Sequence, residues 1–283
     1  MSFSNFIPSV WAEAINRELE RACVFAEDCN RQYEGIVANK GDSVHILGVG
    51  KPTIKELDRE AANNDIDGAE EIEDTSVILN INQIRYFNYM VGDVDKSQGV
   101  NGLMDALSSE TSEGLANAMD KYIANMATDA SVTKLSAAAQ VVTKDNILSL
   151  IDDAIQKLQE NDVNTSNGVV ITVSPRFYKL FKQAYVDKST DNVSELKNGK
   201  VAMYGSVTVK LSNNVAKTKT TADGDTDNIM IRTKRAIAFV NPLTHTEAYR
   251  PEKKFADAVK GFVLFDGKVV RPKEVININV KYA

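Results

Sequence analysis

Histidine and cysteine, the side chains that most often carry nucleophilic, acid–base or metal chemistry, are scarce in this chain of 283 residues. There are two of each, at His45, His245, Cys23 and Cys29. His45 stands in an alternating segment, which favours the polar face of a strand, and no serine or cysteine nucleophile motif accompanies His245. The four residues lack the spacing of a zinc finger or ribbon. We therefore predict no catalytic residue, no metal site and no cofactor.

Two segments match ligand-binding loops only in part. The run Gly48-Val49-Gly50-Lys51-Pro52-Thr53 lacks the first glycine of a phosphate loop, and a proline separates its lysine from its threonine. A turn at the end of a strand is the favoured interpretation. The run from Asn63 to Asp74 has the oxygen ligands and the glycine of a calcium loop, but an aspartate replaces the closing bidentate glutamate. A solvated acidic loop is favoured there, with calcium binding as the alternative.

Charge is distributed unevenly along the chain. Residues 1–141 hold 11 Lys and Arg against 23 Asp and Glu, whereas residues 142–283 hold 22 against 16. Residues 56–74 alone contain nine acids and one arginine and almost no apolar side chains, so this stretch must project into solvent or lie against a basic surface. The net charge of −6 and the lack of a concentrated basic stripe make sequence-specific nucleic-acid reading improbable. Halves of opposite sign favour attraction between copies or between domains.

Targeting signals and disulfides are not expected. No stretch approaches the ~18 consecutive apolar residues of a membrane span. The first basic residue is Arg17, which argues against a signal peptide. Two cysteines do not make a disulfide framework, which favours synthesis in a reducing, intracellular compartment.

Hydrophobic spacing predicts the elements of the first half. Residues 8–27 have the pattern of an amphipathic helix, and residues 98–127 that of the longest helix in the chain. Between them, the spacing predicts a long β excursion, out along Ser43–Leu47 and back along Thr75–Val91. Its middle is the acidic stretch.

The second half alternates helices and strands. Helices are expected after Thr143 and from Ser174-Pro175, where a proline suits the first turn. Strands are expected at Val169–Val173, Val207–Leu211, Ile229–Val240, Gly261–Phe265 and Val275–Tyr282, with polar loops over 187–200 and 213–228. The dipeptide Asp266-Gly267 is a strong hairpin-turn signal. In the last strand Ile276, Ile278 and Val280 alternate with Asn277, Asn279 and Lys281.

The order of these parts resembles the major capsid protein of tailed bacteriophages, which has the Hong Kong 97-type fold. Phe87-Asn-Tyr-Met-Val-Gly-Asp93-Val-Asp95-Lys-Ser-Gln98 is similar to its strand-to-spine junction, and Val173-Ser-Pro-Arg-Phe-Tyr-Lys-Leu-Phe181 to a strand–helix step of its A-domain. The resemblance implies an α+β chain with five parts. They are an N-terminal arm (1–41), an E-loop hairpin (42–91), a P-domain with the spine helix (92–140), an A-domain (141–240) and a β-rich return to the P-domain (241–283).

The resemblance also implies a function. Copies of the chain would assemble as pentamers and hexamers into an icosahedral shell around double-stranded phage DNA, in the host cytoplasm. A separate scaffolding protein, a portal and non-specifically packaged DNA would be further partners, with no membrane. The acidic hairpin would contact basic residues of a neighbouring subunit. The candidate contact residues are Asp65, Asp67, Glu70, Glu71, Glu73 and Asp74 on one side and Lys253, Lys254, Lys268, Arg271 and Lys273 on the other.

Three other interpretations stay open. An encapsulin-type compartment shares the fold but encloses enzymes. A small-molecule enzyme could use the α/β segment 143–240, although so few histidines and cysteines argue against it. A bacterial surface-layer or adhesion protein is disfavoured because a signal peptide is not recognised.

Overall fold

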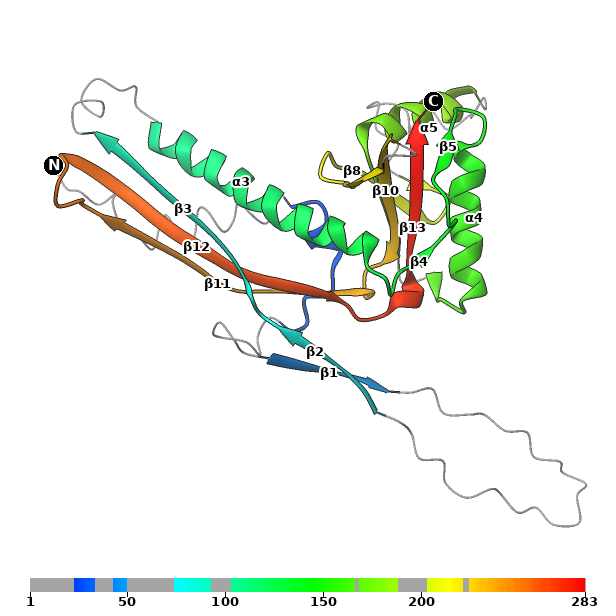
Figure 1. Cartoon of the computed structure of the whole chain (residues 1–283), viewed down its shortest axis with the longest axis horizontal. Helices are drawn as coiled ribbons and strands as arrows, with labels where there is room; N and C mark the ends of the chain where they lie inside the picture. Colours follow the sequence, from blue (N-terminus) through cyan, green and yellow to red (C-terminus); the bar gives the residue numbers. More distant parts are fainter. Residues whose placement is uncertain are drawn as a thin grey trace, which may run out of the picture.

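The computed structural model describes residues 23–33, 43–49, 74–92, 103–165, 168–187, 203–220 and 224–282. Two regions are visible in Figure 1: an extended region of long strands beside one long helix, and a compact region built on a larger sheet. A two-stranded hairpin leaves the place where these regions meet. No helix in the described ranges is long and apolar enough to cross a membrane.

The extended region is a three-stranded antiparallel sheet in the order β11-β12-β3. Its strands are β11 (Ile237–Tyr249), β12 (Ala256–Val269) and β3 (Gln83–Gly92). The helix α3 (Leu103–Asn125) lies along it and continues into the 3-10 turn η4 (Met126–Thr128). At about 1.5 Å per residue α3 is roughly 35 Å long, which confirms a spine-length helix in the predicted place.

The helix and the sheet approach each other closely at one glycine. A Cβ atom on Gly267 would lie 2.9 Å from Cε of Met126 and 3.2 Å from the carbonyl oxygen of Ala238. The C-terminal half of α3 buries Leu115, Met119 and Ile123. A side chain at residue 267 would therefore displace the flexible end of Met126 and crowd the Ala238 carbonyl, so a glycine suits this contact between the end of the spine and the sheet.

The hairpin consists of β1 (Ser43–Val49) and β2 (Asp74–Asn80), which pair antiparallel from Ser43↔Asn80 to Val49↔Asp74. The predicted return strand is interrupted at Ile81 and Asn82, so that β2 belongs to the hairpin and β3 to the three-stranded sheet. Figure 1 shows β2 and β3 as successive parts of one long excursion.

The compact region is an eight-stranded mixed sheet with the path β4-β13-β10-β6-β8-β7. Its strands are β4 (Thr133–Lys134), β5 (Gln140–Val142), β6 (Val169–Val173), β7 (Met203–Tyr204), β8 (Val207–Leu211), β9 (Ala216–Thr220), β10 (Gly224–Thr233) and β13 (Val275–Tyr282). Beside the path, β5 pairs with β13 and β9 with β10. β13 follows the 3-10 turn η6 (Pro272–Glu274), so the end of the chain lies in this sheet.

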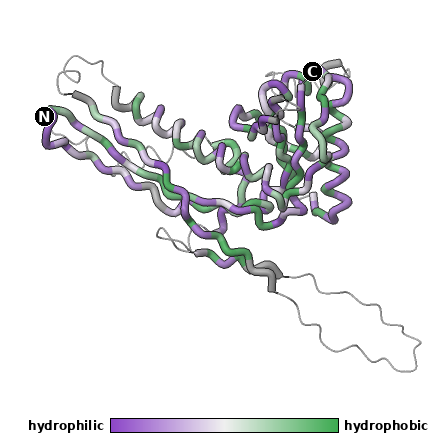
Figure 2. Tube along the Cα trace, viewed as in Figure 1, coloured by the Kyte–Doolittle hydropathy of each residue, from purple (hydrophilic) through white to green (hydrophobic). Residues whose placement is uncertain are grey.

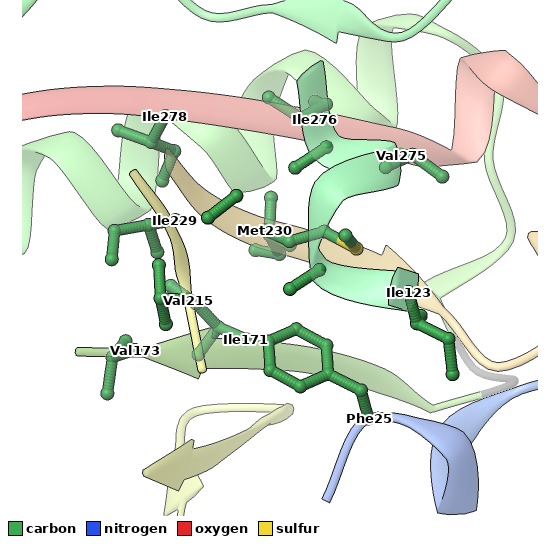
Figure 3. Packing of buried hydrophobic residues seen from close by; sticks show 14 of the residues in the cluster. Phe25, Ile123, Ile171, Val173, Val215, Ile229, Met230, Val275, Ile276 and Ile278 are labelled. Atoms are coloured by element: carbon green, nitrogen blue, oxygen red, sulfur yellow. The ribbon is translucent and has the colours of Figure 1, made fainter. Parts of the chain in front are cut away.

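Two helices pack on this sheet, α4 (Ile147–Glu160) and α5 (Pro175–Asp187). Every residue of β6 is buried, as expected for a short apolar run that is parallel to β8. In Figure 2 hydrophobic residues gather in the strands of the compact region and at the root of the hairpin. Figure 3 shows Phe25 and Ile123 beside Ile171 and Met230 of the sheet.

The segment before the hairpin connects the two regions. Residues 23–30 are not an α-helix, contrary to the C-terminal part of the prediction for 8–27, and include only the 3-10 turn η2 (Ala26–Asp28). The buried carboxylate of Asp120 on α3 accepts the backbone N–H groups of Val24, Phe25 and Ala26 at 2.8, 2.9 and 3.3 Å. Three such donors hold the chain more tightly than apolar contact alone.

Two further sequence expectations were wrong. Asp266-Gly267 is not a turn, because β12 runs through it without interruption. Residues 213–228 are not a loop throughout, because β9 and the first part of β10 lie there. Residues 8–22 of the predicted helix 8–27, and residues 188–200 of the predicted loop 187–200, lie outside the described residues.

Candidate functional site

The acidic candidates lie almost entirely outside the described residues. Asp65, Asp67, Glu70, Glu71 and Glu73 are not among them, nor is the body of the calcium-like segment. Asp74 is the first residue of β2 and stands opposite Val49. This is the end of the described hairpin that points away from the three-stranded sheet (Figure 1).

The basic candidates form two separate groups. Lys253 and Lys254 are exposed in the turn between β11 and β12, whereas Lys268, Arg271 and Lys273 are exposed at the other end of β12 and beside η6. Lys254 and Lys268 are 14 positions apart, almost all of them along β12, which at about 3.3 Å per residue is roughly 45 Å. The structure therefore does not bring the five cations together.

Two of these cations bind groups of their own chain. The ammonium of Lys268 donates to the carbonyl oxygen of Ile78 at 2.9 Å, which fastens β2 to β12. Arg271 pairs with the carboxylate of Glu274 at 3.2 Å. Within the described ranges Lys253, Lys254 and Lys273 form no ion pair with a carboxylate.

The Glu274 carboxylate is the centre of a small charged cluster. It also accepts hydrogen bonds from Thr233 Oγ1 and from Arg235, whose Nε lies 2.9 Å away. Burial acts to raise the pKa of Glu274, but the bonds from Arg235 and Thr233 outweigh it and hold that pKa below its usual value. Arg271 thus belongs to a cluster that joins η6 to the β10–β11 turn.

Apolar side chains bind the root of the hairpin to its own subunit. Val44 and Ile46 of β1, with Leu79 of β2 and Ile81, form a second buried cluster against the three-stranded sheet. The residues of the sheet in this cluster are Ala238, Val240 and Leu264. The alternation of Val44 with Ile46 carried this signal, but the sequence interpretation assigned no buried surface to the excursion.

Asp266 on β12 also binds the root of the hairpin. The Asp266 carboxylate accepts the Tyr122 hydroxyl at 2.6 Å through Oδ1 and the backbone N–H of Asn82 at 3.0 Å through Oδ2. Burial, and then the hydrogen bond to Asp266, raise the pKa of the Tyr122 hydroxyl. Sequence reasoning missed this contact because the Asp-Gly dipeptide predicts a turn.

The far end of the three-stranded sheet exposes large apolar side chains beside its lysines. Phe255 is 88% exposed, and Met90 on β3 is also exposed. The ammonium of Lys254 lies 3.8 Å from the sulfur of Met90. We name Lys253, Lys254, Phe255 and Met90 the strand tip. Large exposed apolar groups of this kind are typical of protein–protein contacts.

The residues that could carry chemistry are dispersed. His45 on β1 and His245 on β11 are exposed, and Cys23 and Cys29 are buried thiols that form no disulfide. Burial, above all, raises the pKa of Cys29. The described part of the chain contains no group of three or more His, Cys, Asp or Glu residues that could hold a metal ion.

Comparison with known proteins shows which of them share this architecture. No protein-family model matches the chain, and no curated protein matches it. Among solved structures, a chain from Mycobacterium phage Che8 has 30% sequence identity and a TM-score of 0.72, and the match covers 90% of each chain. The chain belongs to the major capsid proteins of tailed bacteriophages.

More distant structures share the fold of this capsid protein. A chain from the capsid of the Cyanophage P-SCSP1u has 16% identity and a TM-score of 0.70, over 92% of this chain and 88% of that chain. A virus-like particle from Pyrococcus furiosus has 10% identity and a TM-score of 0.60, over 95% and 98%. The predicted α+β Hong Kong 97-type fold is confirmed.

The predicted function as the subunit of a phage shell is confirmed with the family. The encapsulin alternative has less support, because the structural neighbours are mostly phage capsid proteins. The boundaries between arm, E-loop, P-domain and A-domain stay a prediction.

Proposed function

We propose that this capsid protein assembles, without catalysing a reaction, as pentamers and hexamers into an icosahedral shell that encloses double-stranded phage DNA. The observation that carries the proposal is the hairpin. Its root is buried on its own subunit through the Val44–Leu79 cluster, and its far end, at Val49 and Asp74, points away from the body. A strand pair whose described contacts with the rest of the subunit lie at its root is suited to contact a neighbouring copy.

The direction of the hairpin supports a contact between subunits. Asp74 lies at the end of the hairpin that points away from β3, whereas the strand tip lies at the opposite end of β3 and β12 (Figure 1). The acidic segment that ends at Asp74 has a net charge of −8 over residues 56–74, from nine acids and one arginine. Contact of this segment with a strand tip would be a head-to-tail contact between two copies, the kind of interface that forms a ring when its rotation closes.

The strand tip is the favoured receptor among the basic candidates. Lys253 and Lys254 bind no described carboxylate, and Phe255 offers an exposed apolar anchor beside them. Lys268 and Arg271 already bind groups of their own chain. Each exposed ion pair would contribute only ~0–1 kcal/mol, but a shell repeats the contact in every subunit. Lys273 remains a second candidate at the other end of β12.

The remaining partners follow from the proposed shell. A separate scaffolding protein and a portal would act during assembly in the host cytoplasm. The packaged DNA would be held without sequence preference. The net charge of −6 supports a wall that does not trap DNA, because a strongly cationic inner surface would bind phosphates tightly.

Electron microscopy of the expressed protein tests the shell, and charge reversal tests the contact. We expect closed particles that contain nuclease-protected DNA when portal and scaffold are supplied. The double variant Lys253→Glu/Lys254→Glu should lower the yield of closed shells about tenfold at low salt, since each reversed pair is worth up to about 1 kcal/mol. Yield of the unaltered protein should fall between about 50 mM and about 1 M NaCl as screening increases.

Two further variants make the result specific. Lys217→Glu/Lys219→Glu changes the same charge on the exposed face of β9 and should leave the yield unchanged. Glu70→Lys/Glu71→Lys should restore assembly of the strand-tip variant. Equal yields for all variants at every salt concentration would disprove the electrostatic contact. Particles filled with a protein cargo and no DNA would instead support an encapsulin-type compartment.

A further inference from the structure

An Asp-Gly pair lies in the middle of β12, where the chain is continuous and buried. Asp266 is 5% exposed. Its Oδ1 accepts the Tyr122 hydroxyl at 2.6 Å and the backbone N–H of Gly267 at 2.7 Å, and its Oδ2 accepts the backbone N–H of Asn82 at 3.0 Å. One carboxylate thus connects the spine helix, the long strand β12 and the point where the hairpin begins.

The position of this carboxylate follows from the strand pairing. β3 pairs with β12 from Gly92↔Ala256 to Gln83↔Phe265, and the pairing ends there. One residue further along β12, the edge next to Asp266 is open because Asn82 and Ile81 leave the ladder toward β2. The carboxylate therefore binds the first residue that departs from the sheet.

We propose that Asp266 is a positioning residue for assembly: it sets the direction in which the hairpin leaves the subunit by binding Asn82 and Tyr122 together. This inference rests on the proposed function of the hairpin as the contact with a neighbouring copy. A fixed direction matters because a ring or shell closes only when every copy presents its contact at the same angle.

The other contacts of the root do not fix direction in the same way. The cluster of Val44, Ile46, Leu79 and Ile81 is apolar, and burial of apolar surface is not directional. The bond from Lys268 to the Ile78 carbonyl involves an exposed, flexible side chain. The bonds to Asp266 are charge-assisted and converge on a buried carboxylate, and such bonds are strongly dependent on geometry.

Two conservative variants test the contacts of Asp266 with Asn82 and with Tyr122 separately. In Asp266→Asn one carboxylate oxygen becomes an NH₂ donor. If the remaining oxygen keeps Tyr122 and Gly267, the new donor faces the N–H of Asn82 and that contact is lost. Tyr122→Phe has the opposite effect, because it removes the bond to the helix and keeps the contact with Asn82.

The chain offers a matched control pair. The hydroxyl of Tyr204 donates to Oδ2 of Asp152 at 3.2 Å on the exposed side of the compact region, away from the hairpin. Asp152→Asn and Tyr204→Phe therefore make the same chemical changes in a Tyr–Asp contact that does not hold the hairpin.

Distances between spin labels on the unassembled subunit report the direction. Labels at His45→Cys on β1 and Glu247→Cys on β11 measure the distance from the hairpin to the three-stranded sheet. Labels at His45→Cys and Lys121→Cys measure the distance from the hairpin to the spine helix. The native cysteines are buried and should react little. Loss of a hydrogen bond to a charged acceptor should lower the population of the native orientation about tenfold.

The expected pattern differs between the variants. Asp266→Asn should broaden both distance distributions, and Tyr122→Phe only the one that includes the spine. Both control variants should match the unaltered protein. The yield of closed shells should fall about tenfold with Asp266→Asn, in favour of open or irregular particles, while the subunit keeps its circular dichroism spectrum.

The results test separately whether Asp266 orients the hairpin and whether that orientation governs assembly. Unchanged distributions with Asp266→Asn would show that the carboxylate does not orient the hairpin. Broadened distributions with shells of normal yield and diameter would show that the orientation does not govern assembly. If the unaltered protein itself formed no shells, the proposed function would fail, while the spin-label distances would still decide whether Asp266 sets the direction.

Discussion

The guanidinium of Arg232 lies against Phe25, with its central carbon 5.5 Å from the centre of the ring, and donates to the Phe25 carbonyl oxygen at 2.7 Å. Arg232 is on β10 and 1% exposed, and Phe25 precedes the hairpin by about twenty residues of chain. The contact joins the arm to the larger sheet, and Asp120 joins the same segment to the spine helix. The segment around Phe25 therefore contacts both the larger sheet and the spine helix.

Arg232→Met should be strongly destabilising. It removes the donor to Phe25 and the positive charge that opposes the burial of Asp120, whose pKa is raised by desolvation and would rise further. Leaving the buried Phe25 carbonyl without its charged donor costs about 1–3 kcal/mol, and the loss of charge beside Asp120 adds to it. Urea unfolding of the unassembled subunit measures the free energy of unfolding. Arg232→Lys keeps the charge but not the planar stacking, so its free energy of unfolding should lie between those of the unaltered protein and Arg232→Met. A loss below that expected for an exposed arginine would contradict this role.

Two glycines of β12 should respond differently to alanine. Gly267→Ala meets the flexible end of Met126 at 2.9 Å, so a loss of about 1–3 kcal/mol is expected, and Met126→Ala should largely rescue it. Gly261→Ala meets the backbone carbonyl of His245 and the ring of Phe87, both at 2.6 Å. Shortening Phe87 should not rescue that variant, because the backbone oxygen remains. Thermal unfolding of the single and double variants distinguishes the two cases.

The Glu274 cluster should stabilise the subunit above acidic pH and lose its effect as the pH falls. The pKa of Glu274 is lower in the folded chain than its ordinary value near 4.3, so the stabilisation is complete above that value and disappears as the pH falls through the folded pKa. Glu274→Gln should therefore cost about 1–3 kcal/mol at neutral pH and much less near pH 3.

Urea midpoints at both pH values measure this difference. Glu247→Gln is the control, because Glu247 pairs with Lys260 at 3.1 Å and both side chains are about half exposed; it should change stability by less than about 1 kcal/mol at either pH. An equal loss for Glu274→Gln at neutral and acidic pH would show that the carboxylate charge is not the stabilising group.

Local patterns in the sequence predicted much of the architecture. The apolar run Val169–Val173 is β6, Ser174-Pro175 begins α5, and the longest helical pattern contains α3. The Ser174 hydroxyl accepts the N–H of Phe177 at 3.4 Å, as an N-cap residue should. The ordered set of parts also identified the family. These features depend on periodicity and on short-range hydrogen bonding, which neighbouring residues determine.

Other features required partners that are distant in the sequence. Asn277 alternates with isoleucines and could have faced solvent, but it is buried and donates to Asn228 at 3.1 Å. Asp266-Gly267 has the composition of a turn, yet Tyr122 and Asn82 hold it inside a strand.

The sequence by itself thus determined the kinds of element, their order and the segregation of charge. Only the tertiary structure decided which basic candidates bind groups of their own chain and which carboxylate contacts the root of the hairpin. The physical reason is that hydrophobic periodicity is a local property of the chain, whereas the burial of a polar group depends on partners that long-range packing brings to it.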